Sequence, residues 1–102
     1  MKPFPMYSSF DSLPGSEIIK KGLRDLEKNE QTLESLLVSI ASPRLVRLGF
    51  LVSHPYPDAE NKVYRLLAQN DPDSAHSQYN AFIRLLVSFS RAFENTYLAG
   101  TG

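Results

Sequence analysis

The stretch SAHSQYNAFIRLLVSFSRAFENTY, residues 74–97, decides the fold. Its apolar side chains recur in steps of three and four, which is the spacing of one face of an α-helix. This face carries Tyr79, Phe82, Ile83, Leu86, Phe89, Phe93 and Tyr97. The opposite line is polar at every step, with His76, Asn80, Arg84, Ser88, Arg91 and Asn95. The pattern predicts a long amphipathic helix that begins at Asp73 or Ser74 and forms the spine of the domain.

A second helical pattern lies between residues 16 and 41, and it can be one helix or two. Ser16 suits an N-cap, and the apolar positions are Ile19, Leu23, Leu26, Leu33, Leu37 and Ile40. We favour two helices broken near Asn29. Asparagine suits the residue after a helix, and Thr32 suits the cap of a new one.

The middle of the chain contains strong turn signals. Ser42-Pro43 predicts a separate short helix from Pro43 to Leu48, closed by Gly49 and followed by an apolar anchor, Phe50-Leu51-Val52. A stiff connector, residues 54–57, contains Pro55 and Pro57, whose preceding peptide bonds can be cis or trans. The next helix is expected from about Pro57 to Gln69, ended by Asn70-Asp71-Pro72.

The N-terminal residues 1–15 are expected to form an extended arm, because Pro3, Pro5, Pro14 and Gly15 prevent a long helix. The arm carries an aromatic ring at every third residue, Phe4, Tyr7 and Phe10. We favour an arm that packs on its own domain, and packing on a partner is the alternative. The whole chain then reads as an all-α compact bundle of four to five helices, with residues 16–98 as a single domain and residues 99–102 as a flexible tail.

Composition excludes several classes of site. The 102 residues include no Cys and two His, and eleven basic side chains balance eleven acidic ones. A chain without Cys has no disulfide framework, thiol nucleophile or Cys-based metal site. Overall neutrality argues against a generally basic nucleic-acid binder. The apolar runs are too short to cross a bilayer, so we expect no membrane partner and a cytoplasmic protein.

No pattern in the sequence points to catalysis, and we expect no enzyme activity, cofactor or metal. Glu27, Glu30 and Glu34 can share one side of a helix, but a solvated acidic face explains them. Ser77, His76 and Asp73 are neighbours on one helix and point apart, so they do not form a catalytic triad.

Two binding hypotheses come from the long helix and from the arginines. The first is a non-enzymatic regulatory or adaptor protein that forms a homodimer or binds a helical protein partner. Its interface is the aromatic stripe: Tyr79, Phe82, Leu86, Phe89, Phe93 and Tyr97. The second is a nucleic-acid-associated regulator that contacts phosphates through Arg44, Arg47, Arg84 and Arg91. Polar recognition in either case is assigned to His76, Asn80, Arg84, Arg91, Arg44 and Arg47.

Overall fold

The structure is a computed structural model that describes residues 12–98. In this range the chain forms four α-helices, α2 (Ser16–Glu27), α3 (Leu33–Arg47), α4 (Ala59–Asn70) and α5 (Ala75–Phe93), and a π-helical turn, η2 (Glu94–Leu98). Residues 12–98 contain no β-strand, so the predicted all-α class is confirmed. The predicted tail and most of the predicted arm, with Phe4, Tyr7 and Phe10, lie outside the described residues.

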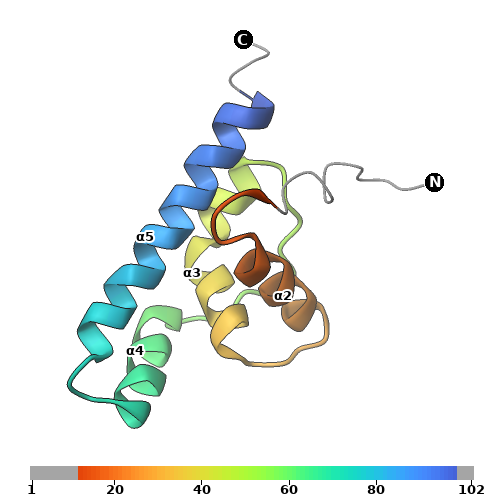
Figure 1. Cartoon of the computed structure of the whole chain (residues 1–102). Coiled ribbons are helices and arrows are strands. Elements are labelled where there is room, and N and C mark those ends of the chain that lie inside the picture. The colour runs from red at the N-terminus through yellow and green to blue at the C-terminus, as the bar shows by residue number, and fades with distance from the viewer. Residues whose placement is uncertain (1–11, 99–102) are drawn as a thin grey trace.

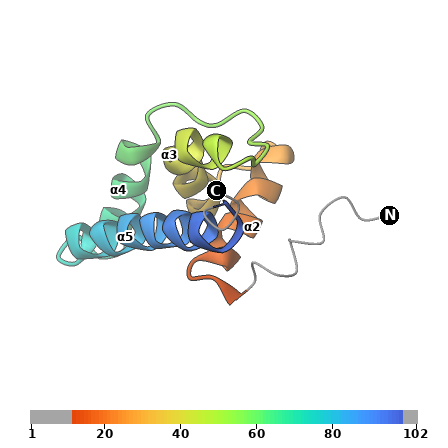
Figure 2. The ribbon, with the colours of Figure 1, turned by 90° about the horizontal axis from the view of Figure 1, so that it is seen from above.

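Helix α3 is the centre of the bundle, since it contacts α2, α4 and α5. Figure 1 shows α5, the longest helix, running past one side of α3 in the same general direction, with α2 on the other side. Seen from above, α3 and α4 lie on the same side of α5 (Figure 2). None of the helices in the described part of the chain is long and apolar enough to span a bilayer.

The break between α2 and α3 lies where the sequence predicts it. Asn29 has a left-handed φ of 59°, and the amide N–H groups of Asn29 and Glu30 donate to Leu26 and Asp25 carbonyls. This is the Schellman pattern of helix termination. Thr32 then caps α3 through a capping box with Ser35. The predicted N-cap of α2 is wrong by one residue: Gly15, with φ 80°, precedes the helix, and Ser16 is its buried first residue.

Helix α3 continues through Pro43, so the predicted separate helix from Pro43 to Leu48 is wrong. Proline in a helix interior costs about 3 kcal/mol because it removes a hydrogen bond and crowds the preceding turn. Ala41 and Leu45 lie one turn apart on the buried face of α3, on either side of Pro43, and a break there would expose them. Gly49, with φ 103°, closes the helix in a second Schellman pattern, as predicted.

The segment between α3 and α4 is held to the bundle at few points. The Phe50 ring packs against Phe93 with 4.9 Å between centroids, whereas Leu51 is 83% exposed, so only part of the predicted apolar anchor reaches the core. The Tyr56 amide donates to the Ser39 hydroxyl at 2.9 Å. The bonds before Pro55 and Pro57 are not cis. Helix α4 starts after Asp58, close to the predicted position.

The core draws its side chains from all four helices. The fully buried members, at 0% exposure, are Ile19, Leu36, Leu37, Val38, Leu45, Val63 and Phe89. Burying one such side chain stabilises the fold by about 1.5–3 kcal/mol. The predicted polar line is exposed at each of its six positions, of which five lie on α5 and Asn95 lies in η2. The amphipathic prediction for α5 is therefore confirmed.

Candidate functional site

The aromatic stripe lies mainly inside this chain's own core. Leu86, Phe89 and Phe93 are 5%, 0% and 2% exposed. Tyr79, Phe82 and Tyr97 are partly buried and pack against the same core. The stripe thus attaches α5 to the rest of the bundle, and its three central side chains are covered by the chain itself.

The predicted polar set divides into two places. His76, Asn80 and Arg84 are exposed on α5, where His76 Nε2 and Asn80 Nδ2 are 3.2 Å apart. The His76 ring also lies beside Tyr64, with 6.3 Å between centroids. Arg44, Arg47 and Arg91 lie elsewhere, around a cavity between α3 and α5. Arg84 is not among the residues that line it.

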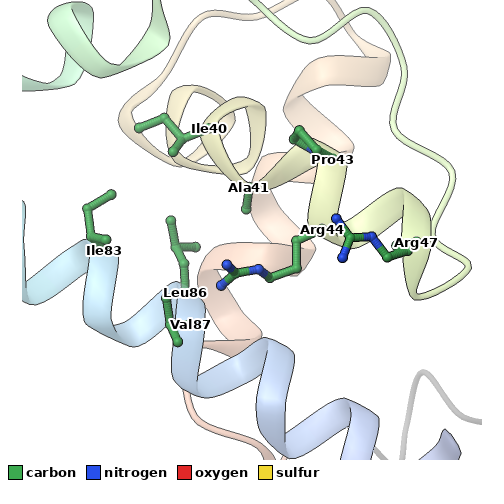
Figure 3. Close-up of a pocket in the computed structure, with 8 residues that line it drawn as sticks. All are labelled: Ile40, Ala41, Pro43, Arg44, Arg47, Ile83, Leu86 and Val87. Carbon is green, nitrogen blue, oxygen red and sulfur yellow. The ribbon is translucent and has the colours of Figure 1, made fainter.

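A groove of about 250 Å³ lies between α3 and α5, and we call it the α3–α5 groove. It is lined by Ile40, Ala41, Pro43, Arg44, Arg47, Ile83, Leu86 and Val87 (Figure 3). Ile40 and Ile83 lie at one end, and the Arg44 side chain extends from α3 toward Leu86 and Val87 of α5. The groove therefore has an apolar end and a cationic end.

A second hollow of about 280 Å³ adjoins the cationic end. Arg44, Arg47 and Val87 line both spaces, and Leu48, Ser90, Arg91 and Glu94 complete the second. The Ser90 hydroxyl donates to the Leu86 carbonyl at 3.0 Å, so it is engaged within α5. Three arginines and one glutamate thus provide the charge of this surface, which is net positive.

The arginines of this surface are not neutralised by their surroundings. Arg44, Arg47 and Arg91 are exposed, and no carboxylate among residues 12–98 lies within ion-pair distance of them. Arg44 and Arg47 occupy the last turn of α3, where the carbonyl ends of the helix favour a positive charge. Their guanidinium groups are available to an anion that arrives from outside.

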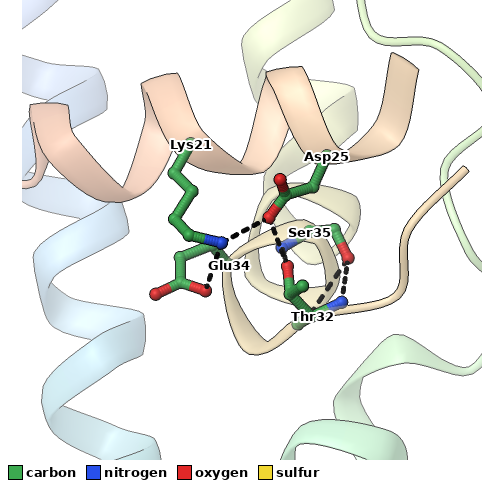
Figure 4. Close-up of polar contacts among 5 residues, drawn as sticks. All are labelled: Lys21, Asp25, Thr32, Glu34 and Ser35. Atoms are coloured by element: carbon green, nitrogen blue, oxygen red, sulfur yellow. Dashed lines mark hydrogen bonds and ion pairs between the residues drawn. The ribbon is translucent and has the colours of Figure 1, made fainter. Parts of the chain in front are cut away.

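The opposite side of α3 carries a closed polar cluster formed by Lys21, Asp25, Thr32, Glu34 and Ser35 (Figure 4). Lys21 Nζ and the Thr32 hydroxyl donate to Asp25 Oδ2 at 2.7 and 2.6 Å. Lys21 Nζ is also 3.5 Å from Glu34 Oε1. The bond from Lys21, followed by that from Thr32, holds the pKa of Asp25 below its ordinary 3.8, although burial opposes this shift. These groups satisfy one another, so we assign the cluster to the fold.

The three carboxylates expected on a solvated face also separate in the structure. Glu34 joins the polar cluster, whereas Glu27 and Glu30 are exposed. Across residues 12–98, no group of three His, Cys, Asp or Glu side chains is placed to hold a metal ion.

No known protein family, curated protein or solved structure matches this chain. The assignment of a site therefore depends on the geometry of the chain alone.

The sequence predicted the arginines that line the groove and the second hollow, but it did not predict most of the other lining residues. Ile40, Pro43, Ile83, Val87 and Glu94 were absent from the predicted site. The lining residues follow helical spacing in the sequence. Ile40, Arg44 and Arg47 are four and three residues apart on α3, and Ile83, Val87 and Arg91 are four residues apart on α5. This spacing predicts a shared groove only when the two helices are known to lie side by side in the same direction.

Proposed function

We propose that this protein is a non-enzymatic helical domain that acts through protein–protein contact, with the α3–α5 groove as its contact surface. The observation that carries the proposal is the exposure of unpaired Arg44 and Arg47 beside an open apolar floor. Arginine next to buried apolar surface is enriched at protein interfaces and at their energetic hot spots.

The charged lining of the groove supports binding over proton transfer. Arginine remains protonated at all ordinary pH values and offers up to five hydrogen-bond donors but no acceptor. Arg44 and Arg47 can therefore hold an anion, while neither acts as a general base.

The contact is proposed for the groove because the centre of the aromatic stripe is already buried by the chain. A two-fold homodimer would bring the same patch of both copies together. Through the groove, this arrangement would place Arg44 and Arg47 of one copy near the arginines of the other. Like charges in contact are unfavourable. We therefore propose a different protein as the partner.

Random dodecapeptides displayed on phage test this proposal. Peptides are selected on the wild-type protein and then rebound to Val87→Glu, which changes the groove, and to Ser88→Glu, which changes an exposed neighbour outside the lining. Circular dichroism checks that both variants are folded. We expect the selected peptides to bind Ser88→Glu as they bind the wild type and to lose binding to Val87→Glu. Equal binding to both variants, or no selected peptide at all, contradicts the proposal.

Nucleic-acid binding is the second candidate, favoured by the gathering of Arg44, Arg47 and Arg91 around one hollow. About three phosphate contacts predict that log K falls with log salt at a slope of about −3. Fluorescence anisotropy with a generic DNA duplex, starting at about 50 mM salt, measures this slope. Absence of binding at the lowest salt excludes this candidate.

A further inference from the structure

The α3–α5 groove combines two chemistries that restrict what can occupy it. Its volume is about 250 Å³, and it adjoins the second hollow of about 280 Å³, with which it shares Arg44, Arg47 and Val87. Together the two spaces can receive several side chains of a protein segment. At the apolar end, Ile40, Ile83 and Leu86 offer only carbon to an incoming group.

The cationic end suits a carboxylate. Arg44 and Arg47 are three residues apart on α3, so both project from the same side of the helix. The planar guanidinium group binds a carboxylate through two parallel hydrogen bonds. Because no carboxylate of residues 12–98 pairs with these groups, a binding partner has no internal ion pair to displace.

We infer that the groove binds an acidic amphipathic segment of another protein, with aliphatic side chains between Ile40 and Ile83 and a carboxylate on Arg44 and Arg47. This inference rests on the proposed function and adds the chemistry of the partner. Charge complementarity between the unpaired arginines and an acidic segment supports this choice of partner.

Glu94 distinguishes such a segment from a continuous polyanion. It lines the second hollow together with Arg44, Arg47 and Arg91. A nucleic-acid strand carries a phosphate at every nucleotide and meets this carboxylate wherever it follows the arginines. A peptide can place one acid at the arginines and a neutral or basic residue at Glu94. The surface therefore fits discrete acids spaced by other residues.

A second copy of this chain fits the groove less well. The acidic turn between α4 and α5 contains Asp71 and Asp73, and it is exposed. Both Asp71 carboxylate oxygens are already engaged, because one accepts from the Asp73 amide and the other from the Ser74 hydroxyl. The turn also lacks a large aliphatic side chain, since its sequence from Asn70 to Ser74 is NDPDS.

The probes are the selected dodecapeptides that bind the wild type and Ser88→Glu but not Val87→Glu. We call these peptides groove-dependent. Each is synthesised in its selected form and in an amide form, with Glu changed to Gln and Asp to Asn. Binding is measured to the wild type, to Arg44→Gln/Arg47→Gln, and to the control Arg65→Gln/Arg84→Gln, which changes two exposed arginines outside the lining. Thermal unfolding verifies that each variant is folded.

We expect the selected sequences to be rich in Glu, Asp and aliphatic residues. The amide form binds the wild type and the control pair at least about tenfold more weakly than the acid form. In Arg44→Gln/Arg47→Gln the two forms bind within about twofold, because the groups that distinguish them are gone.

Four results overturn the inference. Groove-dependent peptides without acidic residues, or an acid-to-amide effect that is equal in all three proteins, overturn the partner chemistry and leave the proposed function standing. A complete lack of groove-dependent peptides overturns both. Sedimentation of the wild type as an oligomer that Arg44→Gln/Arg47→Gln dissociates makes a second copy the occupant.

Discussion

Helix α3 packs against α2 on one side and against α5 on the other, and the two contacts differ in how closely the helices approach. At Gly22 of α2, a Cβ atom would lie 2.3 Å from Val38 Cγ2 and 2.5 Å from the Glu34 carbonyl oxygen, so the helices meet almost backbone to backbone. Between α3 and α5 there is a groove of about 250 Å³.

The polar groups at the two contacts differ in the same way. Between α2 and α3, Lys21 and Thr32 both donate to Asp25, whereas Arg44 and Arg47 have no acidic partner within residues 12–98. A contact that is filled and internally satisfied stabilises the fold and leaves nothing for a ligand. An open contact with unpaired cations can still form new contacts and hydrogen bonds with another molecule.

The largest effect is expected from Gly22→Ala. Alanine normally stabilises a helix relative to glycine by about 1 kcal/mol, but here the new methyl group meets the Glu34 backbone and forces α2 away from α3. We expect the free energy of unfolding to fall by about 3 kcal/mol, measured by urea denaturation. Gly49→Ala is the control, because no atom lies within 4 Å of a Cβ at that position.

Gly49 has a φ of 103°, so its alanine variant is strained by about 1 kcal/mol without a clash. If Gly22→Ala is no more harmful than Gly49→Ala, the close approach of α2 to α3 is contradicted.

The next largest effect is expected from Asp25→Asn, which removes the ion pair with Lys21. We expect a loss of about 2 kcal/mol near neutral pH. Because the folded-state pKa of Asp25 lies below 3.8, its charged form stabilises the protein above the unfolded pKa, and this stabilisation is lost as pH falls through the folded pKa. Urea denaturation at several pH values should show the wild type and variant converging in acid.

Glu27→Gln is the matched control for Asp25→Asn, since it changes an exposed carboxylate on the same helix. A difference between wild type and Asp25→Asn that stays constant down to acid pH contradicts the assignment of the charged Asp25 to the fold.

The smallest effect is expected at the open contact. Arg44→Gln/Arg47→Gln should lower the free energy of unfolding by less than about 1 kcal/mol, because it removes only their favourable interaction with the carbonyl end of α3. Thermal unfolding in low and moderate salt measures the change. A loss as large as that of Asp25→Asn would show that the arginines belong to the fold and would remove the contrast between the two sides of α3.

Local signals in the sequence predicted the helix ends well. Asn29 and Gly49 each adopt a left-handed conformation at a helix terminus, and Thr32 caps α3. Each of these depends on the chemistry of a residue and its immediate neighbours. The exposed line on α5 was predicted for the same reason, because the helical period fixes which side chains share a face.

The errors concern choices that tertiary packing decides. Pro43 carries a strong local signal for a helix start, yet the buried positions of Ala41 and Leu45 keep α3 continuous through it. The aromatic stripe is an apolar face, as predicted, and its Leu86, Phe89 and Phe93 are buried within the chain, while its role as an interface with a partner stays a prediction. A sequence pattern shows that such a face must be covered and does not show by what. Phe89, covered by its own chain, illustrates this limit.

The candidate site was predicted in part. Arg44, Arg47 and Arg91 were named as binding residues, while Arg84 lies outside the groove lining and Ile40 and Ile83 were missed. Whether residues about forty positions apart in the chain face each other depends on how α3 and α5 pack, and local sequence patterns do not determine this packing.

The parallel course of α3 and α5 has a consequence for folding kinetics. The five-residue link between α2 and α3, residues 28–32, closes a short loop, whereas residues 48–74 separate α3 from α5. Because loop-closure entropy grows with the length of the loop, we expect the α2–α3 hairpin to form early and α5 to dock late. The groove exists only after that last step. A ligand that bridges α3 and α5 therefore slows detachment of α5, and its occupancy can be followed as slower hydrogen exchange in that helix.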